Sequence, residues 1–223
     1  INNLDEIKKG PVVFFGNEFF DAIPVKQFKK FKNSMFEKNY TIGENYKIKQ
    51  VYKKASASNL KEIKSYKILK NLKFIEYPKL GFQELKKITK KISKLNGCIL
   101  LIDYGYLRPN NQNTLQSVMQ HKKNKLFNNL GRADITAHVN FALLNEFFLK
   151  NNLKTKNLIS QKEFLENMGL IGRANILAKK MKFTQQTDLY LRIQRLISPK
   201  FMGKMFKVIL AYKFSKNNFA GFK

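Results

Sequence analysis

The sequence predicts an α/β fold, in which helices pack on a mainly parallel sheet. Two short apolar runs, residues 11–16 and 98–102, are typical of strands that are buried on both faces of such a sheet. The second run follows residues 82–95, where apolar side chains recur at helical spacing and lysines take the opposite face. Helix, glycine and apolar strand in this order form the second half of a βαβ crossover.

The first predicted strand leads into a helix. Residues 17–24 turn the chain, and Asp21 is well placed as the N-cap of a helix that runs to about Lys32. Pro24 is tolerated in the first turn, because the N–H groups there have no partner within the helix. We therefore expect a helix between the first strand and the elements that follow.

An insertion is predicted between the two strands of the crossover, over about residues 34–78. Two strand-like stretches, residues 35–42 and 46–52, flank a Gly-Glu-Asn turn and indicate a β-hairpin. Residues 60–72 are expected to form a helix, and residues 74–77 a short extended segment. The α/β pattern thus carries a hairpin and a helix as an insertion.

The later elements have clear boundary signals. Asn96 and Gly97 end the amphipathic helix in the manner of a left-handed C-cap, just before the second buried strand. Ser160 and Glu163 have the spacing of a capping box at the start of a helix. The remaining predictions are extended segments at 114–120, 134–139 and 207–212, and helices at 141–150, 160–168, 173–181 and 187–197.

The composition fits one domain, residues 1–223. Apolar residues make up 43% of the chain, and no repeat or Pro/Gly-rich linker divides it. No apolar run approaches the roughly 20 residues that span a bilayer, and the first ten residues lack a signal sequence. Cys98 is the single cysteine, so no disulfide can form within the chain. We expect a soluble protein without a membrane span, in a reducing compartment.

The net charge of +28 raises the question of a polyanionic partner such as nucleic acid. Of the 43 basic residues only five are arginine, the residue that binds bases and phosphates in a fixed geometry. The lysines are spread along the whole chain, as on a solvated surface. Nucleic acid is therefore not the expected partner, since such binding predicts clustered lysines and a steep dependence on salt.

Polar residues follow both buried strands at the place where open α/β sheets bind ligands, outside the carboxyl ends of the strands. Asn17 and Glu18 follow the first strand, with Asp21 close behind, and Asp103 and Tyr104 end the second. A helix cap is the structural alternative for Asp21, and a turn-forming role for Asp103. Glu18 is the stronger candidate for chemistry, because a carboxylate desolvated after an apolar strand needs a cationic or hydrogen-bonding partner.

Several classes of site lack their motifs. His121 and His138 are isolated from each other and the acids do not cluster at ligand spacing, so no metal site is expected. The sequence contains neither the Gly-x-Ser-x-Gly elbow of a serine hydrolase nor a Gly-x-Gly nucleotide loop. From the residues alone we predict a Rossmann-like sheet with acidic strand ends and no visible cofactor loop.

Three segments resemble the MidA family of S-adenosylmethionine-dependent methyltransferases. Residues 16–25 are similar to the family's Asn-Glu-x-x-Asp-Ala-Leu-Pro-Val block, residues 97–105 to its Asp-Tyr-Gly strand, and residues 131–141 to its Asp-Ile-Thr-Ala-His-Val-Asp-Phe block. Order and spacing agree up to about residue 200. Asn140 departs from the third block, where the family usually has Asp, which argues against a charge-dependent role at this position.

The resemblance implies a class I methyltransferase fold with S-adenosylmethionine as its cofactor. Residues 11–16 and 98–102 would be the fourth and fifth strands of a seven-strand sheet. Family members begin with a strand and a glycine-rich loop that hold the cofactor, and neither is present in this sequence. The resemblance therefore implies the C-terminal portion of a family member, which alone is expected to be inactive.

The resemblance also implies the roles of the strand-end residues, because mitochondrial members of the family are complex I assembly factors that methylate a protein arginine. Carboxylates suit a guanidinium group, which donates paired, charge-assisted hydrogen bonds to them. Glu18 and Asp21 are then catalytic: Glu18 binds and polarises the guanidinium, next to the cofactor, and Asp21 positions it. The other residues assigned to substrate binding are Asn17, Asp103, Tyr104 and His138. Asn17 and Glu18 are also expected to contact the cofactor.

Partners and location follow from the same resemblance. It implies a protein substrate, such as a subunit of complex I, and allows a homodimer. It implies the cytoplasm for a bacterial protein and the mitochondrial matrix for a eukaryotic one. The alternative from another class is a non-catalytic assembly or scaffolding module, which would keep the fold and bind a partner without transferring a methyl group.

Overall fold

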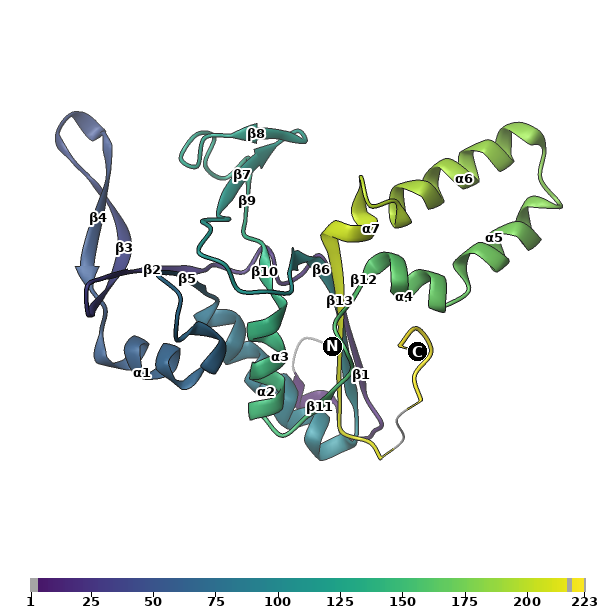
Figure 1. Ribbon diagram of the computed structural model, residues 1–223, viewed down its shortest axis with the longest axis horizontal. Coiled ribbons are helices and arrows are strands. Elements are labelled where there is room, and N and C mark those ends of the chain that lie inside the picture. Colours follow the sequence, from purple (N-terminus) through teal and green to yellow (C-terminus); the bar gives the residue numbers. More distant parts are fainter. Residues whose placement is uncertain (1–3, 216–217, 223) are drawn as a thin grey trace.

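The computed structural model describes residues 4–215 and 218–222, and at its centre lies a sheet with the strand order β1-β6-β13-β11 (Figure 1). β1 (Val13–Asn17) runs parallel to β6 (Cys98–Tyr106), whereas β13 (Phe206–Tyr212) runs antiparallel to β6. Three short strands complete the sheet, namely β10 (Val139–Asn140) beside β6, and β11 (Lys154–Thr155) and β12 (Ile159–Ser160) beside β13. The predicted α/β fold is confirmed.

Two helices cover one face of this sheet. α2 (Lys79–Leu95) buries Leu85, and α3 (Phe141–Lys150) buries Phe148, which has no exposed surface. Both side chains belong to one large core that includes Ile99 of β6. The predicted amphipathic helix is confirmed, because the apolar face of α2 is buried and its lysines lie on the opposite face.

The boundaries of two helices match their sequence signals. Asn96 ends α2 in the left-handed conformation, with φ of 48°, and its N–H donates to the carbonyl oxygen of Ile92. α4 (Gln161–Asn167) begins with the predicted capping box, in which Ser160 and Glu163 bond reciprocally. Phe164 of this helix packs on the opposite face of the sheet from α2 and α3.

β1 differs from the prediction that both of its faces are buried. Val13 and Phe15 are 68% and 65% exposed, whereas Phe14 packs against the core. β1 lies at the end of the strand order, with β6 as its only partner among the described residues. The apolar run forms the predicted strand, but burial of its second face depends on a neighbouring element that the pattern does not specify.

A second sheet has the strand order β4-β3-β2-β5 and stands beside the first (Figure 1). Its β3–β4 hairpin was predicted, and β5 matches the predicted extended segment. The bounds of the strands are β2 (Lys26–Phe31), β3 (Ser34–Ile42), β4 (Ile48–Lys54) and β5 (Phe74–Tyr77), and the 3-10 turn η2 (Glu44–Tyr46) joins β3 to β4. The division into one domain with an insertion over residues 34–78 stays a prediction.

The helix predicted from Asp21 to Lys32 is wrong, because this segment contains β2. Lys-Gln-Phe-Lys-Lys-Phe has no strong local preference, and pairing decides its conformation, since β2 bonds to β3 on one side and β5 on the other. Phe28 of β2 is fully buried in the main core.

The helix predicted over residues 60–72 begins and ends earlier in the structure and is shorter. α1 (Ala57–Ser65) stops before Tyr66, and the 3-10 turn η3 (Lys67–Leu69) follows.

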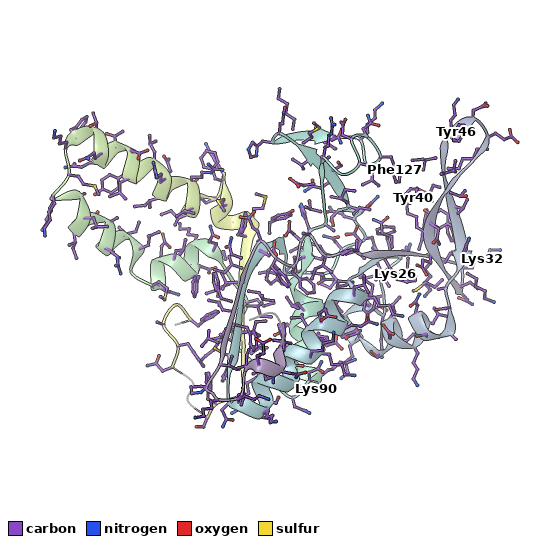
Figure 2. The ribbon with its side chains drawn as sticks, turned by 180° about the vertical axis from the view of Figure 1, so that it is seen from behind. Lys26, Lys32, Tyr40, Tyr46, Lys90 and Phe127 are labelled. Carbon is purple, nitrogen blue, oxygen red and sulfur yellow. The ribbon has the colours of Figure 1, made fainter. Side chains whose placement is uncertain are left out.

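A third sheet and a helical hairpin project from the body of the molecule (Figure 1). The ring of Phe127, beside the third sheet, meets Tyr40 of the β3–β4 hairpin at 4.6 Å between centroids (Figure 2). The third sheet consists of β7 (Gln116–Met119), β8 (Lys122–Asn124) and β9 (Asp134–Thr136), and the helical hairpin of α5 (Leu170–Ala178) and α6 (Phe183–Ile197). The remaining elements are η1 (Leu4–Glu6) and α7 (Met202–Met205). Among the described residues, no helix is long and apolar enough to cross a bilayer.

Candidate active site

The carboxyl ends of β1 and β6 meet at one edge of the sheet, and Asp103 fastens them together. Its Oδ2 accepts hydrogen bonds from three consecutive backbone N–H groups after β1, at 3.2, 2.8 and 3.2 Å, which belong to Phe19, Phe20 and Asp21. Its Oδ1 accepts from the N–H of Tyr104 at 2.9 Å. Asp103 is only 1% exposed and both of its oxygens accept backbone hydrogen bonds, so none is left for a substrate.

The electrostatic environment of Asp103 raises its pKa to about 6. Burial is the largest cause, because it disfavours the charged carboxylate, and the neighbouring Asp21 adds like-charge repulsion. Three backbone N–H groups act in the opposite direction by stabilising the carboxylate. Two buried acids, Asp21 and Asp103, thus lie close together at this strand end, and their repulsion contributes to the raised pKa of Asp103.

Asp21 is the second buried acid, and its two oxygens differ. Oδ2 accepts a short hydrogen bond from the hydroxyl group of Tyr104. Oδ1 is buried, since Asp21 is only 6% exposed, and it has no hydrogen-bond partner among the described residues. Asp21 is not the cap of a helix, as the sequence suggested, because a strand follows it. Its spare oxygen is a buried acceptor without a donor, which is costly unless a ligand supplies one.

Tyr104 connects Asp21 to His138. Burial is the largest cause that raises the pKa of the Tyr104 hydroxyl group, followed by its bond to Asp21, so this group stays protonated and donates. The rings of Tyr104 and His138 meet edge to face, with centroids 5.4 Å apart. Burial lowers the pKa of His138, which keeps the imidazole neutral near pH 7.

Asn17 and Glu18 lie at the open side of the same strand end. Both side chains are exposed, and Glu18 has a left-handed φ of 48°. The prediction that the fold desolvates the Glu18 carboxylate is wrong, because this side chain is exposed. The four residues that the structure brings together are Asp21, Asp103, Tyr104 and His138, while Asn17 and Glu18 flank them.

Sequence reasoning missed Glu76, a buried carboxylate of β5. It is 7% exposed and accepts from the Gln27 amide at 2.8 Å and from the N–H groups of Thr114 and Leu115, each at 3.1 Å. The hydroxyl group of Thr114 donates to the other oxygen of Glu76 and accepts from the backbone N–H of His138 at 3.0 Å. Glu76 thus fixes the backbone that carries His138. An acid between Ile75 and Tyr77 in a predicted strand was the available signal.

The position of Asn140 at the start of α3 explains why Asn can replace the Asp that the family usually has there. Its side-chain oxygen caps α3 by accepting from the N–H of Leu143 at 3.0 Å. Asn and Asp serve equally well as N-caps, so the position keeps this role without a charge. Asp134 of the same block is exposed on β9 and lies outside the buried cluster.

No group of three or more metal-binding side chains occurs in the part of the chain that the structure describes. The functional groups that the structure brings together at this strand end are the Asp21 carboxylate, the Tyr104 hydroxyl group and the His138 imidazole. Together with the parallel strand pair, these features define the class: an α/β protein of the kind that binds ligands beyond the carboxyl ends of its strands.

The comparison with family models identifies the group within this class. Residues 1–159 match the model described as "Putative S-adenosyl-L-methionine-dependent methyltransferase". The match covers most of the chain, and the chain belongs to this family. The resemblance of the three sequence blocks to the MidA methyltransferases is thereby confirmed.

Curated relatives carry a more specific description. The chain is 28% identical over 189 residues to the protein arginine methyltransferase NDUFAF7 homolog, mitochondrial, of Caenorhabditis elegans, covering 83% of this chain and 44% of the relative. It is 26% identical over 215 residues to protein arginine methyltransferase NDUFAF7, mitochondrial, of Homo sapiens, covering 92% and 46%. The chain thus spans about half the length of the curated relatives it matches.

Solved structures support the fold. A COG1565 superfamily member from Burkholderia thailandensis, bound to S-adenosyl-homocysteine, superposes with a TM-score of 0.80 at 24% identity, over 100% of this chain and 58% of that one. A native structure of a COG1565 superfamily protein from the same organism gives a TM-score of 0.83 at 23% identity, over 100% and 60%. The Rossmann-like α/β fold is confirmed.

Proposed function

We propose that the gene product containing this chain transfers a methyl group from S-adenosylmethionine to an arginine of a protein substrate, and that Asp21 binds the guanidinium group. The observation that carries this proposal is the buried Oδ1 of Asp21, which lacks a donor among the described residues. The family to which the chain belongs and the names of its relatives support the reaction.

A guanidinium group matches the vacant acceptor in charge and in geometry. It is planar, always positive and donates hydrogen bonds in a fixed fork, so it suits a carboxylate oxygen that lacks a donor. Tyr104 already holds the other oxygen of Asp21, which fixes the plane of the carboxylate. Binding a cation there also offsets the repulsion between Asp21 and Asp103, which contributes to the raised pKa of Asp103.

The residues at the end of β1 fit one side of a cofactor site. Asn17 offers an exposed amide and Glu18 an exposed carboxylate, which suit the amino and hydroxyl groups of S-adenosylmethionine. When bound, the cofactor supplies an electrophilic methyl group. The sequence contains no Gly-x-Gly loop, so these two side chains form only part of a cofactor site.

The chain's own residues would then orient the substrate and receive its proton. Asp21 Oδ1 holds one N–H of the guanidinium and so restricts rotation of the attacking nitrogen, which is the main contribution expected of an enzyme in such a displacement. When that nitrogen gains the methyl group it loses one proton, and Asp21 Oδ1, which would accept a hydrogen bond from it, would receive that proton. Tyr104 keeps Asp21 in place, and the neutral His138 packs against Tyr104.

The substrate protein and the compartment are further parts of this proposal. We keep a complex I subunit as the proposed substrate, the mitochondrial matrix as the compartment in a eukaryote and the cytoplasm in a bacterium. A homodimer stays a proposal too, and charge works against it, because two copies of a chain with net charge +28 repel each other. The α5–α6 hairpin presents exposed apolar side chains such as Phe183, which is 82% exposed, and is the surface we assign to partner contact.

Transfer of tritium from methyl-labelled S-adenosylmethionine tests the proposed reaction. The whole gene product should label peptides that contain arginine and leave the same peptides unlabelled when lysine replaces every arginine. Amino acid analysis should then recover the label in methylarginine. Binding of cofactor without any transfer would instead support the scaffolding alternative.

A further inference from the structure

A cavity lies between the β2–β3 turn, the end of β4, α1 and η3, and none of its lining residues belongs to the strand-end site. Its volume is about 460 Å³. Figure 2 labels Lys32 in the turn beside it. Its apolar lining comes from Met35, Leu60, Ile63 and Leu69. Ile63 and Leu69 are each 2% exposed and belong to the main core, so the cavity is an opening in the edge of that core.

Every charged residue that lines this cavity is basic. Four exposed lysines surround the apolar lining, and among the described residues none of them takes part in an ion pair within 4 Å; they are Lys30, Lys54, Lys64 and Lys70. The remaining lining residues, Asn33 and Ser34, are polar and neutral. The hollow therefore combines apolar walls with four positive charges.

The acids closest in sequence to the rim are engaged with other lysines. Glu37 of β3 pairs with Lys26 at 2.6 Å and accepts from the Asn59 amide at 3.1 Å. Glu62 of α1 pairs with Lys79 at 3.3 Å. These contacts direct the negative charges of both segments away from the cavity, which leaves the positive charges of the rim uncompensated.

We propose that this cavity binds an amphipathic anion, namely a molecule with an alkyl chain and a carboxylate or phosphate head group, such as a fatty acid or an anionic lipid. The apolar chain would leave water by contacting Met35 and Leu60, and the head group would lie among the lysines. A hollow of this size, mostly apolar and with a few convergent polar groups, is typical of sites for small ligands. An anion also reduces the mutual repulsion of the four ammonium groups, which strengthens its binding.

Titration calorimetry with dodecanoate, below its micelle concentration, tests the proposal on the full chain. Lys54→Glu combined with Lys64→Glu should weaken dodecanoate binding by about tenfold or more, since charge-assisted contacts are lost and two like charges are added. The matched control is Lys86→Glu combined with Lys90→Glu, which changes the net charge equally on exposed positions of α2, where Figure 2 labels Lys90. The control should bind within about twofold of the parent chain, because a distant surface charge is largely screened.

Two further comparisons separate the possible results. Dodecyltrimethylammonium has the same chain with a positive head and should not bind. Sedimentation with phosphatidylglycerol vesicles, compared with phosphatidylcholine vesicles, shows whether a membrane lipid is the source of the ligand. Binding of dodecanoate or of anionic vesicles that depends on Lys54 and Lys64 supports the proposal. Binding of neither, equal binding of the cation, or equal losses in both charge-reversed variants overturns it.

If the first pair of substitutions lowers the melting temperature, Lys54→Gln with Lys64→Gln replaces it. Both positions are exposed, and neutral amides there should leave the fold intact. The amide variant should still bind dodecanoate several-fold more weakly than the parent chain, since charge-assisted contacts are stronger than neutral ones. Unchanged binding by a folded amide variant contradicts the proposal.

Discussion

Buried carboxylates lie at two places in the molecule, the carboxyl ends of β1 and β6 and the junction between β5 and residues 113–115, but the two places differ in how fully the carboxylates are hydrogen-bonded. At the junction, both oxygens of Glu76 accept hydrogen bonds, and at the strand end both oxygens of Asp103 in β6 do the same. Asp21 alone of these three acids keeps a buried oxygen without a donor among the described residues. Burial and charge are shared by all three, so the difference lies in hydrogen bonding. Saturated carboxylates hold the backbone in place, and an unsaturated one is available to a ligand.

The strongest test of this contrast is Asp21→Asn in the whole gene product. We expect methyl transfer to fall by about a hundredfold or more, because an amide removes the charge that binds the guanidinium, an effect of roughly 3 kcal/mol. The far-ultraviolet circular dichroism spectrum and the melting temperature should stay close to those of the parent protein, which separates a loss of chemistry from a loss of fold.

Glu18→Gln is the matched control for that variant. Sequence reasoning placed Glu18 first, but its exposed side chain makes weaker contacts in water, so we expect a loss of about tenfold or less. Initial rates measured at saturating cofactor compare the two variants directly. A larger loss for Glu18→Gln than for Asp21→Asn would reverse the assignment.

Glu76→Gln should affect stability more than chemistry. The amide cannot accept all of the bonds that the carboxylate accepts, and the buried donors of Thr114 and Leu115 lose partners, at a cost of about 2–3 kcal/mol. Urea unfolding of the chain measures this free energy of unfolding. Glu84→Gln, which removes only an exposed contact with Lys87, should change it by less than about 0.5 kcal/mol. Equal stability of the two variants would refute the structural role of Glu76.

The pKa of Asp103 predicts how stability depends on pH. Its folded value of about 6 lies above the ordinary value of 3.8, so the folded chain binds more protons at this group than the unfolded chain does. The stabilisation from protonated Asp103 is fully present below about pH 4 and is lost as the pH rises through about 6, by at most about 1.4 kcal/mol per pH unit.

The comparison of Asp103→Asn with the parent chain isolates this contribution. Unfolding free energies measured between pH 4 and 6 should decline less steeply with pH in the variant, whatever its absolute stability. Parallel curves for the two chains would show that Asp103 has the same pKa in both states.

Asn140→Ala is expected to have the smallest effect. Removing the side-chain acceptor at the start of α3 should cost about 1 kcal/mol, whereas Asn140→Asp keeps the cap and should be nearly neutral. Thermal unfolding of the three chains distinguishes these results. If Asn140→Asp instead changed methyl transfer strongly, the position would have a role beyond capping.

Local signals predicted the elements whose patterns are complete within one segment. The face of α2, the left-handed Asn96 and the Ser160 capping box all depend on residues that are close in sequence, and all three are confirmed. β2 was missed because its conformation is decided by β3 and β5, which pair with it from elsewhere in the chain. The second face of β1 was misjudged for the same reason.

The candidate site was predicted in outline and not in detail. The rule that ligands bind beyond strand ends brought Asp21, Asp103 and Tyr104 into consideration. No pattern in the sequence could show that Asp103 would bind three backbone N–H groups and leave Asp21 with a spare oxygen, because those contacts join residues more than 80 positions apart. Glu76 was missed in the same way, since its partners lie on β2 and on a loop distant in sequence.

The central claim is that Oδ1 of Asp21 receives a guanidinium group, and carbon-13 NMR of aspartate carboxyl groups tests it most directly. The whole gene product, labelled at Asp Cγ, is titrated with an arginine peptide and with its lysine counterpart, and the Asp21→Asn variant assigns the signal. We predict that the Asp21 signal moves with the arginine peptide and barely moves with the lysine peptide. An Asp21 signal that stays fixed while the arginine peptide binds would contradict the account.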